Sequence, residues 1–159
     1  NDISAGRLDE KMTQVVASLN VPYIVMHMQG TPQTMQLDPQ YKDVVTEVRD
    51  YLRAACDECS AAGIKDVVVD PGFGFGKTVE HNYQLLKSLH TLRILGKPIL
   101  AGLSRKSMIY KTLNSDADHA LNGTTALNMV ALQQGANILR VHDVKEAVET
   151  VQLFEALNN

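Results

Sequence analysis

Several features that would point to particular protein classes are scarce or missing in this sequence. There is no tryptophan among the 159 residues, and the two cysteines are too few for the disulfide framework of a secreted domain. No segment approaches the roughly 18 consecutive apolar residues of a membrane span, and we recognise no secretory signal. We therefore expect a cytoplasmic protein that makes no contact with a membrane.

An excess of positive charge is also missing. The 15 Lys and Arg residues are opposed by 18 Asp and Glu, which gives a net charge of −3 and no reason to expect a nucleic-acid partner. No linker or low-complexity tract divides the chain, so we expect residues 1–159 to form a single domain. The chain starts with Asn1 rather than Met, in what looks like the end of a strand, and we expect it to be truncated.

The segment 70–78, Asp-Pro-Gly-Phe-Gly-Phe-Gly-Lys-Thr, follows the apolar stretch 65–69. Such a stretch predicts a buried parallel strand, and a strand that opens into a glycine-rich loop is typical of a small-molecule site. Both common nucleotide motifs are excluded, because a Walker loop needs Gly where Pro71 stands and a dinucleotide fingerprint needs Gly where Lys77 stands. The carboxylate of Asp70 would instead accept hydrogen bonds from ligand N–H groups, the alternative being a structural ion pair or helix cap.

Helical and strand patterns alternate along the chain. Asp38 is a plausible helix cap with Pro39 at the first helical position, and Gly63 would end that helix. The expected helices are 7–20, 38–62, 79–95, 120–134 and 144–157, and the expected strands are 21–27, 67–70, 98–103 and 136–141. This alternation implies a parallel sheet with right-handed crossovers.

Polar, reactive residues follow every expected strand, whereas the turns at the opposite ends are plain. They are Asn1-Asp2, His27, Asp70, Ser104-Arg105-Lys106 and Arg140 with His142 and Asp143. Convergence of all strand ends on one site favours a barrel over an open doubly wound sheet. Because a (βα)8 barrel takes roughly 250 residues, we expect an α/β fold that is the C-terminal half of a (βα)8 TIM barrel, with parallel strands and flanking helices.

Potential cations gather after the last two strands. Arg105 and Lys106 follow one of them, and Arg140 and His142 follow the other. In barrels the loops at these places commonly bind phosphate, and residues two apart, such as Arg140 and His142, share one face of a strand. We expect them to hold an anionic substrate group; the alternative is an ordinary solvated group of charges.

Three further candidates have plain structural alternatives. His27 could be catalytic, although a single histidine at a strand end is more often structural. Asn1 could donate and accept hydrogen bonds, or simply form a turn. Cys56 and Cys59 form a C-x-x-C inside an expected helix without a second cysteine pair, so we expect neither a zinc nor a redox site.

Five segments carry a family resemblance through their order and spacing. They are Asn1–Ser4, Met26–Pro32, Asp70–Lys77 with His81-Asn82, Ser104–Ser107 and Arg140–Asp143. The third and fourth are the most specific. With these segments the chain resembles, over essentially its whole length, the dihydropteroate synthases of bacterial folate synthesis.

The resemblance implies a (βα)8 barrel that condenses 6-hydroxymethyl-7,8-dihydropterin diphosphate with p-aminobenzoate to dihydropteroate and pyrophosphate, and that sulfonamides inhibit. Catalysis would rest on stabilising the departing pyrophosphate and a developing pterin cation. The catalytic residues implied are Asp70, Lys106, Arg140 and His142. By the same resemblance Asn1, Asp70 and Lys106 bind the pterin, Phe75 and Ser104 border the p-aminobenzoate pocket, and Arg140 and His142 hold the diphosphate.

The departure from the family is one of length. We expect the first three strands to be missing, together with family residues that bind Mg2+, the diphosphate and the pterin, so no metal ligand is assigned in this chain. We therefore expect this chain alone to be inactive or nearly so, and to form a homodimer through its C-terminal helices. A pterin-binding methyltransferase domain with the same barrel, or a non-catalytic truncated fragment, are the alternatives.

Overall fold

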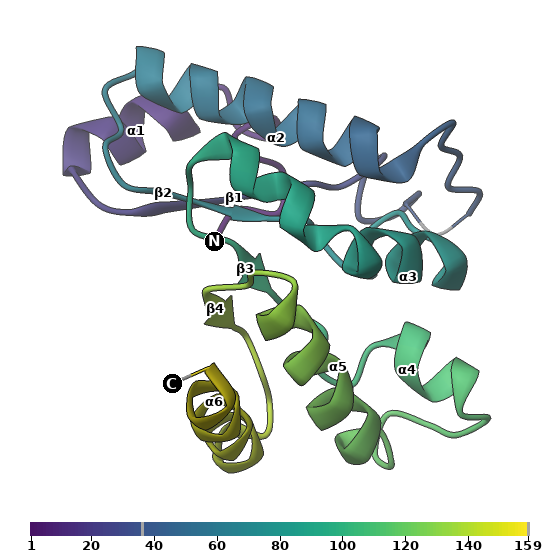
Figure 1. Ribbon diagram of the computed structural model, residues 1–159. Helices are drawn as coiled ribbons and strands as arrows, with labels where there is room; N and C mark the ends of the chain where they lie inside the picture. The colour runs from purple at the N-terminus through teal and green to yellow at the C-terminus, as the bar shows by residue number, and fades with distance from the viewer. Residues whose placement is uncertain (36, 159) are drawn as a thin grey trace.

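A computed structural model describes residues 1–35 and 37–158 of the chain (Figure 1). Its elements, in chain order, are α1 (Met12–Leu19), β1 (Tyr23–Met26), α2 (Val44–Ala61), β2 (Val67–Asp70), α3 (Val79–Lys87), the 3-10 helix η1 (Leu89–Leu95), β3 (Leu100–Ala101), α4 (Ser107–Thr112), α5 (Leu121–Gln133), β4 (Ile138–Leu139) and α6 (Val144–Asn158). The expected alternation of strands and helices is confirmed. Among the described residues, no helix is both long and apolar enough to cross a membrane.

The strands lie side by side in the order in which they occur in the chain. β1 pairs with β2 and β3 pairs with β4, both parallel and in register from Tyr23 opposite Val67 and from Leu100 opposite Ile138. A single parallel bridge between Val69 and Ile99 joins the two pairs. Another bridge adds Asp2 beside β1, so the expected strand end at the start of the chain is confirmed. All the strand ends therefore point the same way.

The helices cover the outside of this row of strands. In Figure 1, α1 and α2 lie along the β1–β2 pair, α5 and α6 lie next to β3 and β4, and α4 lies beside α3, away from β3 and β4. Parallel strands in sequential order with a helix after each are the arrangement of part of a (βα)8 barrel. The largest fully buried side chains are Phe73, Met26, Leu52, Leu85, Leu89, Leu92, Ile99, Leu103, Met108, Ile109, Val25 and Val44.

Two expected helix starts are wrong. The helix expected from 7 begins only at Met12, because Asp9 Oδ1 accepts from Lys11 N (2.9 Å) in a turn directly before it, after a first turn in which the Asp2 carboxylate accepts from Ser4 N and Gly6 N (2.8 and 2.6 Å). The helix expected from Asp38 begins at Val44, because Asp43 is its cap and accepts from the backbone N–H groups of Val45 and Thr46.

The other differences are in length. The helix expected over 79–95 is split at Ser88 into α3 and η1, although Gly96 ends it in a left-handed conformation as expected. The helix α4 was not expected, because Ser107–Thr112 is too short to show a helical period. β3 and β4 are two residues each, shorter than the apolar runs that predicted them.

Candidate active site at the strand ends

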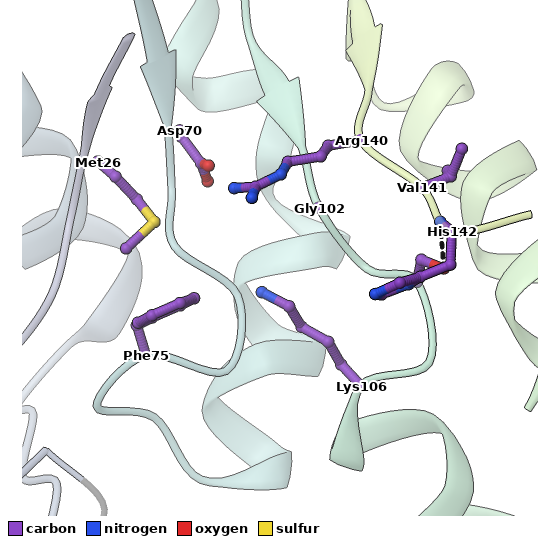
Figure 2. A pocket seen from close by; sticks show the side chains of 9 residues that line it. Met26, Asp70, Phe75, Gly102, Lys106, Arg140, Val141 and His142 are labelled. Atoms are coloured by element: carbon purple, nitrogen blue, oxygen red, sulfur yellow. Dashed lines mark hydrogen bonds between the residues drawn. The ribbon is translucent and has the colours of Figure 1, made fainter. Parts of the chain in front are cut away.

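A cavity of about 370 Å³ lies at the carboxyl ends of the strands (Figure 2). It is lined by Met26, Asp70, Phe75, Gly102, Ser104, Lys106, Arg140, Val141 and His142. β1 and β2 contribute the first two, the loop after β2 contributes Phe75, and the exits of β3 and β4 contribute the rest. Six of the seven residues expected at the site line this one cavity. The seventh, Asn1, joins them through a side-chain hydrogen bond to Asp70.

Asp70 is the carboxylate of the cavity. Its side chain is 4% exposed, and burial raises the pKa of the carboxyl group above its ordinary value. A hydrogen bond from Gly72 N to Oδ1 (2.8 Å), the positive charge of Lys106, the Asn1 hydrogen bond and the charge of Lys77 act in the opposite direction. Since Asp70 ends β2 and its side chain faces the cavity (Figure 2), it can accept further hydrogen bonds from a ligand.

Lys106 binds the loop after β2. Its Nζ donates to the carbonyl of Phe73 and lies 4.8 Å from the centre of the Phe75 ring, where cation and ring attract one another. Burial lowers the pKa of Lys106 to about 8, with the Asp70 carboxylate acting in the opposite direction. This ammonium therefore lies at the aromatic wall of the cavity and acts on the Asp70 carboxylate through its charge.

The opposite wall is basic. Arg140 extends its guanidinium toward Asp70 in Figure 2, and His142 follows it two residues later. Ser104 fixes His142 twice, because its Oγ lies 2.9 Å from Nδ1 and accepts from the backbone N–H at 3.2 Å. Lys106, Arg140 and His142 thus surround a space suited to an anionic group.

Arg105 is not part of this cluster, so the expectation of four potential cations at the site is corrected to three. Arg105 has a left-handed backbone (φ +55°), and its N–H donates to Thr124 Oγ1 (3.0 Å). The turn directs its side chain away from the cavity, where the guanidinium pairs with Asp143 (2.7 Å). Arg105 therefore joins the two strand exits instead of lining the site.

The sequence did not reveal what supports the loop after β2. Lys77 and Asn82 are 4% and 1% exposed and hold the loop by hydrogen bonds to its backbone. Burial lowers the pKa of Lys77 to about 7. The run Gly76-Lys77-Thr78 was interpreted only as a segment that does not match a Walker loop. A single Asn in a helix gives no sequence signal that it binds a loop.

His27 has the structural role that its position favoured. It is 5% exposed and absent from the cavity lining. Burial and the nearby charge of Lys77 lower the pKa of His27 to about 2, so the ring is neutral. Its ring lies edge-on to Tyr51 with the ring centres 4.7 Å apart, and its Nδ1 is hydrogen-bonded to Lys77 Nζ.

The cavity does not suit a divalent metal ion. Among the described residues, Asp70 is the only carboxylate in its lining, and Lys106 and Arg140 would repel a cation there. Across residues 1–35 and 37–158, no group of three or more His, Cys, Asp or Glu side chains is arranged to hold a metal. The thiols of Cys56 and Cys59 are buried in α2, and burial raises the pKa of both, to about 11 for Cys59.

Comparison with known proteins assigns the chain to a family. Residues 1–142 match the family model described as pterin binding enzyme. The chain belongs to the pterin-binding enzyme family. Curated relatives include the dihydropteroate synthases of Haemophilus influenzae, 44% identical over 161 residues, and of Escherichia coli, 46% identical over 145 residues. The first match covers 100% of this chain and 58% of the relative, and the second covers 90% and 51%. This pterin-binding chain therefore spans about half the length of these curated relatives.

Solved structures support the same family at the level of the fold. Dihydropteroate synthase from Yersinia pestis, in a sulfonamide complex, superposes with a TM-score of 0.96 at 41% identity, covering 99% of this chain and 58% of that one. The Thermus thermophilus enzyme, in complex with 6HMPPP, gives 0.95 at 41% identity, covering 100% and 64%. The expected α/β fold, part of a (βα)8 barrel, is confirmed for this pterin-binding protein.

Proposed function

We propose that this chain carries the pterin, p-aminobenzoate and diphosphate subsites of a dihydropteroate synthase. One observation carries the proposal: a buried carboxylate, Asp70, shares a cavity with Lys106 and Arg140 and with the aromatic ring of Phe75. A pterin diphosphate presents N–H donors at one end and a polyanion at the other. The cavity offers an acceptor, Asp70, for the first and cations, Lys106 and Arg140, for the second.

The pterin would lie against Asp70. The Asp70 carboxylate would accept hydrogen bonds from the adjacent N–H groups of the ring. The hydrogen bond that Asp70 receives from Asn1 helps to fix the orientation of the carboxylate. Lys106 would lie against the other side of the pterin. In the transition state the negative charge of Asp70 would stabilise positive charge developing on the ring.

The diphosphate would lie against Arg140 and His142. In the reaction the bond between the pterin methylene carbon and the diphosphate oxygen breaks, and that oxygen keeps the electron pair. The amine of p-aminobenzoate forms the new C–N bond and releases one proton. Fixed cations next to the leaving pyrophosphate lower the barrier, because the negative charge on its oxygen increases as the C–O bond breaks.

The p-aminobenzoate would lie between Phe75 and Ser104. Related structures support this choice of ligands: Thermus thermophilus dihydropteroate synthase has been solved in complex with 4-aminobenzoate, and the Yersinia pestis enzyme with a pterine-sulfa conjugate. We extend these ligands to the present chain, with sulfonamides as inhibitors at the p-aminobenzoate end.

Three further parts of the proposal concern the whole protein. Because the described residues do not fit a divalent cation, ligands for Mg2+ would come from the part of the family's length that this chain does not span. We also propose a homodimer through the C-terminal helices, which is supported by apolar side chains that α6 leaves exposed; these include Val148, Leu153 and Leu157. The location proposed for the enzyme is the cytoplasm.

The test is turnover by a full-length protein that contains this chain. We expect pyrophosphate release from pterin diphosphate that depends on p-aminobenzoate and is inhibited by a sulfonamide. Arg140→Ala should lower kcat/KM on the order of a hundredfold, whereas Lys111→Ala, which removes an exposed lysine of α4 outside the cavity, should leave it unchanged. Methyl transfer without pyrophosphate release would contradict the proposal and favour a pterin-binding methyltransferase. The same assay on residues 1–159 alone tests the expectation of an inactive fragment.

A further inference from the structure

The loop after β2, residues 71–76, is fastened by a lysine that does not line the cavity. Lys77 is 4% exposed, and its Nζ lies 2.9 Å from His27 Nδ1, 2.9 Å from the Gly72 carbonyl oxygen and 3.0 Å from the Phe75 carbonyl oxygen. A buried ammonium group is costly unless each of its three N–H donors finds an acceptor. These three atoms supply one acceptor each.

The partnership with His27 keeps these contacts in either charge state of the lysine. When Lys77 is an ammonium, it donates to both carbonyls and to Nδ1 of the neutral imidazole. When Lys77 is a neutral amine, it still donates to both carbonyls and can accept from Nδ1 of the other histidine tautomer. The fastening of the loop therefore does not depend on one protonation state.

Further contacts hold the same loop from outside the cavity. Asn82, which is 1% exposed, accepts from Gly74 N (2.7 Å), and the Tyr41 hydroxyl donates to the Gly76 carbonyl (2.7 Å). The side chain of Phe73 is fully buried in the core. The backbone of the loop is thus bound on the protein side, while the ring of Phe75 lines the cavity.

We propose that Lys77 is a positioning residue, which binds the Gly72 and Phe75 carbonyls and so holds the Phe75 ring at the end of the cavity assigned to p-aminobenzoate. This inference rests on the proposed function for the identity of that ligand. Asp70 depends less on Lys77, because its backbone is held by the β1–β2 ladder and by the bond from His27 N to its carbonyl (3.0 Å), and its side chain takes a single bond from the loop, from Gly72 N (2.8 Å). Loss of Lys77 should therefore affect the two substrates unequally.

The experiment compares Lys77→Met with Lys87→Met, an exposed lysine of α3, in the full-length protein that contains this chain. In Lys77→Met we expect faster amide hydrogen exchange over residues 71–76 than in the wild type, with unchanged exchange in β2. We also expect the KM for p-aminobenzoate to rise on the order of tenfold, because the ring that orients it is no longer fixed. The Kd for pterin diphosphate, by calorimetry, should stay within about twofold of the wild-type value. Lys87→Met should change none of these quantities.

Unchanged amide exchange over residues 71–76 would show that Lys77 does not hold the loop. An equal rise in the KM for p-aminobenzoate and in the Kd for pterin diphosphate would overturn the positioning role, since a general structural defect would weaken both substrates alike. Should Lys77→Met fail to fold, Tyr41→Phe is the second variant, which removes only the hydrogen bond to Gly76. It should raise the KM for p-aminobenzoate more than the Kd for pterin diphosphate, by a smaller factor than Lys77→Met; equal rises in the two would again overturn the inference. If the wild-type protein does not use p-aminobenzoate at all, the proposed function fails and so does the identity of the positioned ligand. The exchange data then still decide whether Lys77 fastens the loop.

Discussion

The guanidinium of Arg105 and the carboxylate of Asp143 form a two-pronged ion pair, with Nε to Oδ2 at 3.0 Å and Nη2 to Oδ1 at 2.7 Å. The pair joins the exit of β3 to the exit of β4. Its members are the direct chain neighbours of Lys106 and His142, which line the cavity. A fork of this kind fixes both distance and orientation. It thereby sets the spacing of Lys106 and His142 at the site.

Replacing Arg105 by Lys tests this relationship without changing the net charge. Lysine cannot make the parallel pair of bonds to Asp143, so the two strand exits should lose their fixed spacing. We expect the Kd for pterin diphosphate to rise about three- to tenfold, and the Kd for the pterin alcohol to stay constant. The matched control is Arg53→Lys, at an exposed position of α2, which should change neither value. Equal affinities for wild type and Arg105→Lys, measured by calorimetry, would contradict the role of the ion pair.

The affinity for pterin diphosphate should fall with rising pH because of Lys106. Burial lowers the pKa of this lysine to about 8, so its positive charge is present below that pH and is lost as the pH rises through it. Between pH 7 and pH 9 the protonated fraction falls about tenfold, and the association constant should fall with it. In Lys106→Arg the guanidinium stays charged throughout this range, so the profile should lose this step. A wild-type profile that matches the one of Lys106→Arg would rule out the titration of Lys106 as its cause.

Gly72 should tolerate no side chain. Its φ is +67°, and a Cβ would lie 1.9 Å from the carbonyl oxygen of His27. Gly63 also has a positive φ of +85°, but a Cβ there meets nothing within 4 Å. Gly63→Ala should therefore cost only the left-handed strain of about 1 kcal/mol, whereas Gly72→Ala should lower the free energy of unfolding by more than about 3 kcal/mol. Urea unfolding of both variants measures the difference, and equal losses would show that the backbone yields at Gly72.

Much of the site could be predicted from the sequence because its residues follow strands. Parallel strands bring their carboxyl ends together whatever their length, so Asp70, Ser104 and Arg140 could be expected at one site although β3 and β4 have only two residues each. The direction of a single side chain was harder to foresee. Arg105 and Lys106 are adjacent cations, and only the left-handed turn at Arg105 decides which of them faces the cavity.

Other features depended on contacts between distant parts of the chain. Lys77 finds its partner His27 fifty residues earlier, a contact that no local pattern encodes. The start of α2 was misplaced for a similar reason. Asp38-Pro39 has the local features of a helix start, but the backbone of Gln40 is bound to the side chain of Gln29, which keeps this segment outside the helix.

Calorimetry with two ligands tests the central claim, that Asp70 binds the pterin ring and Arg140 the diphosphate. The full-length protein containing this chain, with its Asp70→Asn and Arg140→Ala variants, is titrated with pterin diphosphate and with the pterin alcohol. Asp70→Asn should weaken both ligands by the same factor, about tenfold or more, since the ring is common to them. Arg140→Ala should weaken the binding of pterin diphosphate and leave the binding of the pterin alcohol unchanged. Unchanged affinities in Asp70→Asn, or equal losses of both ligands in Arg140→Ala, would contradict the account.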